Sequence, residues 1–189
     1  AQQVRSGAFV VSLRDALGDA HCLRRDPRIK LIRATTPRAF HYQQSTFAMQ
    51  VVSAVCFRAL REERKIVYGI GIGATPFRDF DLYEMEIMFA MGRREECASS
   101  LCRLPELVKE RGREEFEIEK CEGMTRLELS DHTLRQMYVS AMREVAVFGY
   151  VQTYYELMRV LEETTFDDVV RCVEELFAPD RSLMVTIVP

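Results

Sequence analysis

Apolar residues recur along this chain at two spacings, one typical of helices and one typical of strands. Between residues 45 and 63 they fall at i, i+4 positions with further apolar residues on both sides, which predicts a largely buried helix. Strict alternation over 66–74 and 83–89 instead predicts two strands joined by a hairpin-like connection. The second strand alternates apolar residues with glutamates, which is typical of an antiparallel strand with one face toward solvent.

The remaining segments complete the prediction of an α+β domain. Thr165 and Asp168 have the spacing of an N-terminal helix cap in which aspartate replaces the usual glutamate. The helix over 93–111 is predicted to end at Gly112 and to be kinked by Pro105. The element order predicts a mainly antiparallel sheet with helices packed on one face. Further strands are predicted over 29–34 and 183–188, and further helices over 113–128, 131–147, 151–162 and 165–177.

The strand over 66–74 carries a stripe of small residues. Strict alternation places Ile66, Tyr68, Ile70 and Ile72 on one face and puts Val67 with three glycines, Gly69, Gly71 and Gly73, on the other. Glycine inside a strand favours close approach of a neighbour, so we expect another element to pack tightly against the glycine face. The GxGxG motif lies within the strand rather than between a strand and a helix, which excludes a dinucleotide-binding turn.

Length, charge and composition limit the classes of protein further. The chain has 189 residues, and we expect 28–189 to form one domain preceded by an extension or linker over 1–27, in which 7–17 is a short strand or helix. A net charge of −3 disfavours a dedicated nucleic-acid binder. The longest stretch without charged side chains, 39–57, is too polar to span a membrane, and the first residues lack the pattern of a signal peptide. The cellular compartment stays open.

Cysteines and histidines do not form a recognisable metal motif. The six cysteines have irregular spacings without a CxxC pair, and three of them, Cys56, Cys97 and Cys172, lie among apolar residues, so we expect reduced and mostly buried thiols. No two of the three histidines lie within one helical turn of each other, so neither HExxH nor HxxEH can form. The sequence therefore predicts no metal held by this chain.

One segment combines two candidate functional side chains. In LREERKIVYG, Arg61 and Tyr68 lie seven residues apart across a predicted helix-to-strand junction. A guanidinium and a phenol placed there can converge on one carbonyl or carboxylate oxygen. The alternative is structural: charged residues solvate the end of a buried helix and Tyr68 begins the strand.

The segment LREERKIVYGIGIG resembles the LR-E-x-x-G-L-x-Y stretch of the C-terminal half of pitrilysin/insulinase-type zinc metallopeptidases, the inverzincins, which include mitochondrial-processing-peptidase-like proteins. The closing segment TTFDDVVRCVEELFAPDRSLMVTIVP is also similar to that family, and the resemblance covers residues 28–189. The chain departs from the family at Ile66-Val67, set against the usual Gly-Leu.

The resemblance implies a division of labour between two halves that close like a clamshell. The N-terminal half of such peptidases holds zinc through HxxEH and a later glutamate, whereas the C-terminal half binds no metal. Its arginine and tyrosine, which correspond to Arg61 and Tyr68 here, bind the substrate and the tetrahedral intermediate. The resemblance thus implies no catalytic residue in this chain, no cofactor bound by it, and zinc in a partner N-terminal domain.

These implications lead to one expected function and two alternatives. We expect a C-terminal domain or subunit of a zinc-dependent peptidase that is inactive alone, binds an extended peptide substrate and a metal-bearing half, and forms a homo- or hetero-oligomer. The first alternative is a catalytically inactive assembly homologue of the same fold, like the core subunits of respiratory complexes that resemble processing peptidases. The second is an unrelated α+β binding module.

Overall fold

A five-stranded sheet forms the centre of the molecule. Its strands are β1 (Gly7–Ser12), β2 (Arg28–Thr35), β3 (Val67–Pro76), β4 (Asp81–Phe89) and β5 (Leu183–Val188), arranged in the order β1-β5-β2-β4-β3. β2 pairs antiparallel with β4 and β5, β3 pairs antiparallel with β4, and β1 runs parallel to β5. The sheet is therefore mainly antiparallel, as predicted. The computed structural model describes residues 7–12, 27–36, 41–128, 134–177 and 182–188.

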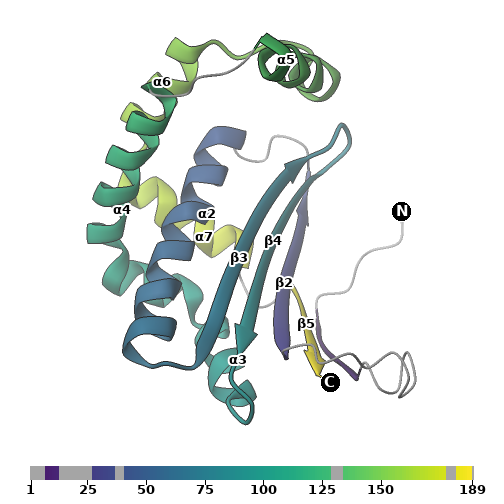
Figure 1. Cartoon of the computed structure of the whole chain (residues 1–189), viewed down its shortest axis with the longest axis vertical. Helices are drawn as coiled ribbons and strands as arrows, with labels where there is room; N and C mark the ends of the chain where they lie inside the picture. Colours follow the sequence, from purple (N-terminus) through teal and green to yellow (C-terminus); the bar gives the residue numbers. More distant parts are fainter. Residues whose placement is uncertain (1–6, 13–26, 37–40, 129–133, 178–181, 189) are drawn as a thin grey trace.

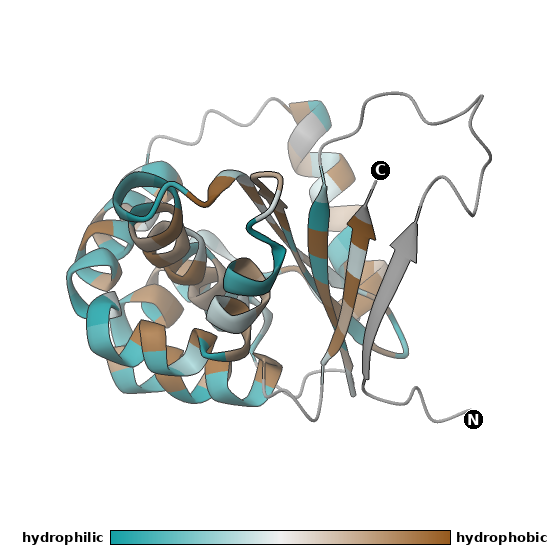
Figure 2. Ribbon diagram, turned by 90° about the horizontal axis from the view of Figure 1, so that it is seen from below, coloured by the Kyte–Doolittle hydropathy of each residue, from teal (hydrophilic) through white to brown (hydrophobic). Residues whose placement is uncertain are grey.

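Helices cover one face of this sheet, and no helix of the described residues covers the other face (Figure 1). The helices are α2 (Tyr42–Cys56), its π-helical continuation η2 (Phe57–Glu63), α3 (Arg94–Cys102), α4 (Leu104–Glu128), α5 (Leu134–Phe148), α6 (Tyr154–Glu163) and α7 (Phe166–Phe177). α2 packs on β3, and α4 packs against both α2 and α7. Seen along the other axis, most of the helices lie to one side of the strands (Figure 2). This arrangement confirms the predicted α+β class.

The core lies between α2 and the covered face of the sheet. β4 alternates fully buried and half-buried residues along its whole length, as its sequence pattern predicted. Three aromatic rings connect the helices: Phe47 of α2 lies 5.6 Å from Phe116 of α4, which lies 5.8 Å from Phe166 of α7. Edge-on ring contacts of this kind add to the stabilisation from burial alone.

One polar pair is completely buried within this core. The hydroxyl of Tyr83 donates to Oγ of Ser45 at 2.9 Å, and the Ser45 hydroxyl donates to the carbonyl of Tyr42 at 2.9 Å. Burial raises the pKa of Tyr83 to about 12. Because each hydroxyl has a partner, the pair is held in the core without an unsatisfied donor.

The helical region after β4 differs from the prediction. The helix expected over 93–111 divides at Arg103, and the next helix continues past Gly112 to Glu128, so Gly112 does not end a helix and 113–128 is not a separate one. Pro105 lies in the first turn of α4, where its missing N–H costs nothing, and it kinks no helix. A Cβ at Gly112 would lie 3.1 Å from the ring of Phe166, so this glycine serves helix packing.

Helix caps follow the sequence more closely. Oδ2 of Asp168 accepts from the backbone N–H of Thr165 at 3.0 Å, and the Asp168 N–H donates to the Thr165 hydroxyl at 3.2 Å, which confirms the predicted cap of α7. These hydrogen bonds from Thr165 hold the pKa of Asp168 below its usual range. The capping box of α6, formed by Thr153 and Glu156, was not anticipated, although its T-x-x-E pattern is visible in the sequence.

The five cysteines that the structure describes have free thiols, as expected. Cys56, Cys97 and Cys172 are buried, whereas Cys102 and Cys121 are exposed. Burial raises the pKa of Cys97 and of Cys172 to about 12. The sixth cysteine, two of the three histidines and residues 13–17 of the uncertain early element lie outside the described residues. Within the described part of the chain, no helix is long and apolar enough to cross a bilayer.

Candidate functional site: the α2–β3 junction

The backbone is irregular throughout the junction that carries both candidate residues. α2 widens into the π-helix η2, which contains Arg61, and Lys65 then adopts a left-handed conformation with φ of 52°. The N–H of Ile66 donates to the carbonyl of Leu60 at 2.9 Å and closes the turn. A left-handed residue after a helix is normally glycine, because other residues are strained there.

This left-handed position corrects the alignment made from the sequence. Counted from Leu60, the glycine of the LR-E-x-x-G-L-x-Y pattern falls on Lys65 and its leucine on Ile66, rather than on Ile66 and Val67. The conformation agrees with this count, because Lys65 is the residue with positive φ. The chain thus keeps the turn of the pattern without its glycine.

A β-bulge changes the position of Tyr68. In the pairing of β3 with β4, Val67 lies opposite Phe89 and Gly69 lies opposite Met88, so Tyr68 has no partner of its own. Val67 is buried and the Tyr68 side chain is 59% exposed. The expectation that Tyr68 shares a face with Ile70 and Ile72 is therefore wrong, because the extra residue shifts the alternation by one position.

The glycine face of β3 also differs from the prediction. Gly69, Gly71 and Gly73 lie on the open face of the sheet, opposite Met88, Glu86 and Glu84. A Cβ at Gly73 would have no atom within 4 Å, and one at Gly71 would meet only the Glu86 carbonyl oxygen at 4.0 Å. No other element among the described residues packs against these two positions, so the absent side chains leave open space.

Arg61 and Tyr68 are both exposed at the same end of β3, one before the turn and one after it. The Arg61 guanidinium lies over the ring of Phe57, 4.8 Å from its centroid, in a cation–π contact. Within the described structure no hydrogen bond joins Arg61 to Tyr68. Their convergence on one substrate oxygen stays a prediction.

An acidic groove begins beside this junction. The groove, called here the α2–α4 groove, has a volume of about 680 Å³ and runs from α4 across α2 to Ile72 of β3. The ring of Phe57, on which Arg61 stacks, forms part of its wall. Its lining includes two arginines, Arg58 and Arg126, and five glutamates, Glu62, Glu114, Glu115, Glu119 and Glu122.

Arg58 links the helices that form the groove. Its Nη1 lies 2.6 Å from Glu114 Oε2 and 2.7 Å from Glu115 Oε1, and these hydrogen bonds raise the pKa of Arg58. Glu115 lies in a helical segment rich in charged residues, yet it is buried and lines the groove. The sequence carries no signal for this contact, because 56 residues separate Arg58 from Glu114.

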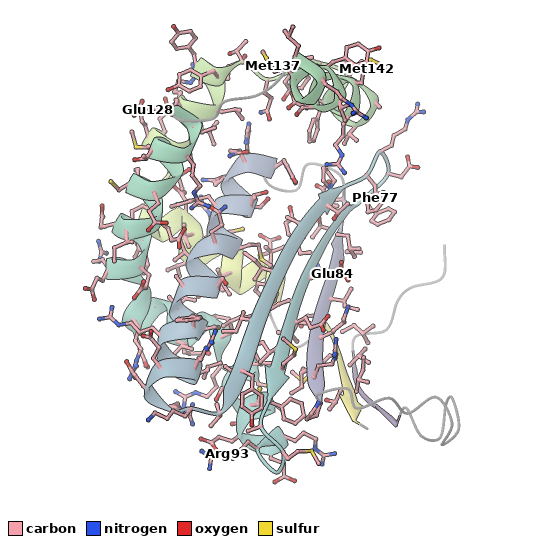
Figure 3. The ribbon with its side chains drawn as sticks, viewed as in Figure 1. Phe77, Glu84, Arg93, Glu128, Met137 and Met142 are labelled. Carbon is pink, nitrogen blue, oxygen red and sulfur yellow. The ribbon has the colours of Figure 1, made fainter. Side chains whose placement is uncertain are left out.

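A second hollow lies on the open face of the sheet. It has a volume of about 220 Å³ and is lined by Lys30, Gly71, Ile72, Gly73, Glu84 and Glu86. Partial burial alone would raise the pKa of Glu86, but Lys30 at 2.9 Å and Arg28 at 2.5 Å outweigh it and hold that pKa below its usual range. Figure 3 shows Glu84 on the sheet, away from the helical layer.

The junction and its surroundings do not fit a metal. No group of three or more histidine, cysteine, aspartate or glutamate side chains in the described ranges is placed to hold an ion. We therefore derive no step through a metal bound by this chain.

Solved structures share this fold at low sequence identity. An inactive domain of peptidase M16 from Pseudomonas fluorescens superposes with a TM-score of 0.74 at 15% identity, covering 98% of this chain and 43% of that one. A protease from Helicobacter pylori gives a TM-score of 0.71 at 14% identity, covering 98% and 45%. An inactive peptidase domain assigned to a zinc protease of Bordetella parapertussis gives 0.67 at 13% identity, covering 88% and 94%.

These comparisons confirm the fold that the sequence resemblance implied. The chain has the fold of inactive M16 peptidase domains, and it spans less than half the length of the first two proteins. No family model and no curated protein matches the sequence.

Proposed function

We propose that this chain is the metal-free half of a zinc-dependent peptidase and contributes Arg61 and Tyr68 to a catalytic centre whose metal is bound by another domain or subunit. The observation that carries the proposal is the β-bulge at Tyr68. Regular alternation would turn this phenol toward the core with Ile70, whereas the bulge places it in solvent. Bulges that re-aim a side chain are concentrated next to active sites.

The two side chains suit the stabilisation of negative charge on a peptide carbonyl. The Tyr68 hydroxyl donates one hydrogen bond, and the planar guanidinium of Arg61 donates two in parallel. Zinc in the partner half supplies the Lewis acid. Donors held in place before the reaction act most strongly on the oxyanion that develops in the transition state, since they need no reorganisation.

An exposed apolar stripe supports association with such a half. On α5, side chains that recur at helical spacing are turned to solvent, including Leu134 at 86% and Met142 at 55% exposure. Met137 and Met142 lie on this helix near the hairpin that joins β3 to β4 (Figure 3). Exposed apolar surfaces of this kind mark sites of protein association. The stripe is formed by Leu134, Met137, Tyr138, Met142 and Val145.

Kinetics of the enzyme assembled with its metal-bearing half test the proposal. Tyr68→Phe keeps the ring and removes one donor, so we expect turnover to fall about 10²-fold, the usual effect of losing one oxyanion donor. Arg61→Ala should lower turnover at least as much, and Arg61→Lys should restore little, because an ammonium cannot reproduce the planar fork. The chain alone should cleave no peptide when zinc is added.

Matched exposed residues away from the junction provide the controls. Tyr155→Phe on α6 and Arg94→Ala on α3 remove the same groups and should leave turnover unchanged. Urea unfolding of each variant separates a kinetic defect from a loss of stability. Unchanged turnover in both Tyr68→Phe and Arg61→Ala would contradict the proposed role.

A second candidate function is an inactive assembly subunit of the same fold. The stacking of Arg61 on Phe57 favours it, because this contact gives the arginine a structural role without substrate. In that case Met142→Glu on α5 should disrupt the assembly, whereas Tyr68→Phe should have no kinetic effect.

A further inference from the structure

An aromatic ring, rather than a carboxylate, holds the side chain of Arg61. The guanidinium lies over the ring of Phe57, four residues earlier on η2, at 4.8 Å from the ring centroid. Within the part of the chain that the structure describes, no salt bridge or hydrogen bond ties Arg61 to another side chain. Three charged residues close to it in sequence do have ionic partners. The pairs are Arg58 with Glu114 and Glu115, Glu63 with Arg111, and Arg64 with Glu96.

This difference decides which donors of Arg61 are available. A guanidinium has five N–H donors, and a carboxylate partner commonly takes up two of them at once. An aromatic ring instead attracts the cation through its π-electrons. The contact with Phe57 therefore restrains the guanidinium without a hydrogen bond to a carboxylate, and the donors that the proposed function requires stay available to a substrate oxygen.

The ring of Phe57 is itself anchored on a packed helix. Its backbone N–H donates to the carbonyls of Ser53 and Ala54 in the last turn of α2. The nearby residues Cys56 and Leu60 are fully buried, which fixes this part of the helix against the core. The ring is 40% exposed and forms part of the wall of the α2–α4 groove. Side chains carried by packed helices hold a geometry more precisely than side chains on loops.

Arg61 needs such a restraint more than Tyr68 does. The arginine side chain is long and exposed, so without a contact it would sample many conformations. Selecting one conformation during the reaction costs entropy, and a donor placed beforehand avoids that cost. The phenol of Tyr68 is placed by the backbone bulge of β3. Two different devices thus position the two donors.

We propose that Phe57 is a positioning residue, whose ring holds the guanidinium of Arg61 in place for the substrate oxygen without contacting the substrate itself. The inference rests on the proposed function, since it concerns the donor that this function assigns to Arg61. In an inactive assembly subunit the same contact would contribute to stability alone.

Kinetics of Phe57 variants in the assembled enzyme test the inference. Phe57→Leu removes the ring and keeps an apolar side chain, so kcat should fall about two- to five-fold with KM little changed, as for loss of an exposed cation–π contact. Phe57→Tyr and Phe57→Trp keep an aromatic face and should restore most of kcat. In the Arg61→Ala background, Phe57→Leu should have no further effect, because no guanidinium is left to hold. Phe77→Leu removes a ring of almost equal exposure, 41%, beyond the other end of β3 and should leave kcat unchanged.

A spectroscopic measurement on the chain alone tests the contact without activity. The ring of Phe57 should shift the NMR signal of the Arg61 Nε–H, and Arg61→Lys identifies that signal by its disappearance. Phe57→Leu should remove the shift, whereas Phe57→Trp should keep one. An Arg61 signal that is the same with and without the ring would overturn the inference.

The kinetic outcomes separate this inference from the proposed function. A normal defect of Arg61→Ala together with unchanged kcat in Phe57→Leu would overturn the positioning role alone. A higher kcat in Phe57→Leu would also overturn it, since the ring would then withdraw the guanidinium from the substrate. Unchanged turnover in both Arg61→Ala and Tyr68→Phe would contradict the proposed function and the positioning role with it.

Discussion

Replacing Lys65 with glycine should stabilise the protein, although it removes a side chain. Lys65 has φ of 52°, where the Cβ of an ordinary residue lies too close to its own backbone. The side chain is exposed, so its removal sacrifices no packing. Among the described residues it is the one non-glycine with positive φ, which makes the site suitable for measuring backbone strain at the junction.

The change in the free energy of unfolding on Lys65→Gly is the sum of two opposing contributions. Relief of the left-handed strain contributes about 1–2 kcal/mol, and the greater freedom of glycine in the unfolded chain removes about 0.5–1 kcal/mol. We expect a net gain of roughly 0.5–1 kcal/mol, which corresponds to an increase in Tm of about 1–4 °C for a chain of this length.

Urea unfolding and thermal melting of Lys65→Gly and Lys65→Ala measure this gain. Lys65→Ala removes the same side chain and keeps the strain, so its free energy of unfolding should stay within about 0.5 kcal/mol of the original protein. Equal stabilities of the glycine and alanine variants would refute the assignment of strain to this position.

Two further predictions concern the buried pair and the cap of α7. Ser45→Ala leaves the buried Tyr83 hydroxyl without its acceptor and should lower the free energy of unfolding by about 1–3 kcal/mol. Tyr83→Phe leaves Ser45 bonded to Tyr42 and should lower it by less. Urea unfolding measures both values, and a larger loss in Tyr83→Phe would contradict the hydrogen-bond network. The pKa of Asp168 is lower in the folded protein than in the unfolded chain, where it is near 3.9. The contribution of its carboxylate to the free energy of unfolding is therefore complete above the unfolded pKa and is lost as the pH falls through the folded pKa. The stability gap to Asp168→Asn should thus be constant from pH 7 to about 5 and shrink below pH 4, and a gap independent of pH would contradict the carboxylate's role.

Features set by local sequence could be predicted, and those set by distant contacts could not. The alternation of β4 and the Thr165–Asp168 cap depend on residues close in the chain, and both were predicted correctly. Gly112 resembled a helix end because its neighbour Phe166 lies far along the sequence. The same limit applies to the bridge from Arg58 to α4.

The two candidate residues were chosen by their type and spacing, but the geometry of the junction that carries them was not predicted. The seven-residue spacing of Arg61 and Tyr68 identified the junction, whereas strict alternation placed Tyr68 on the wrong face. A prediction from alternation assumes that the two strands pair without interruption. The bulge depends on the register in which β3 pairs with β4, which the amino-acid sequence of β3 alone does not reveal. The groove could not be anticipated either, since its walls come from separate elements.

Three backbone irregularities follow one another at the α2–β3 junction. A connection between α2 and β3 needs neither a π-helix nor a left-handed lysine nor a bulge, yet all three follow one another between Phe57 and Gly69. Strained backbone at successive positions persists where a site requires it. Here it exposes both Arg61 and Tyr68, one on each side of a single turn. The proposed pairing of the two donors requires this exposure, because a side chain buried in the core could not reach a substrate.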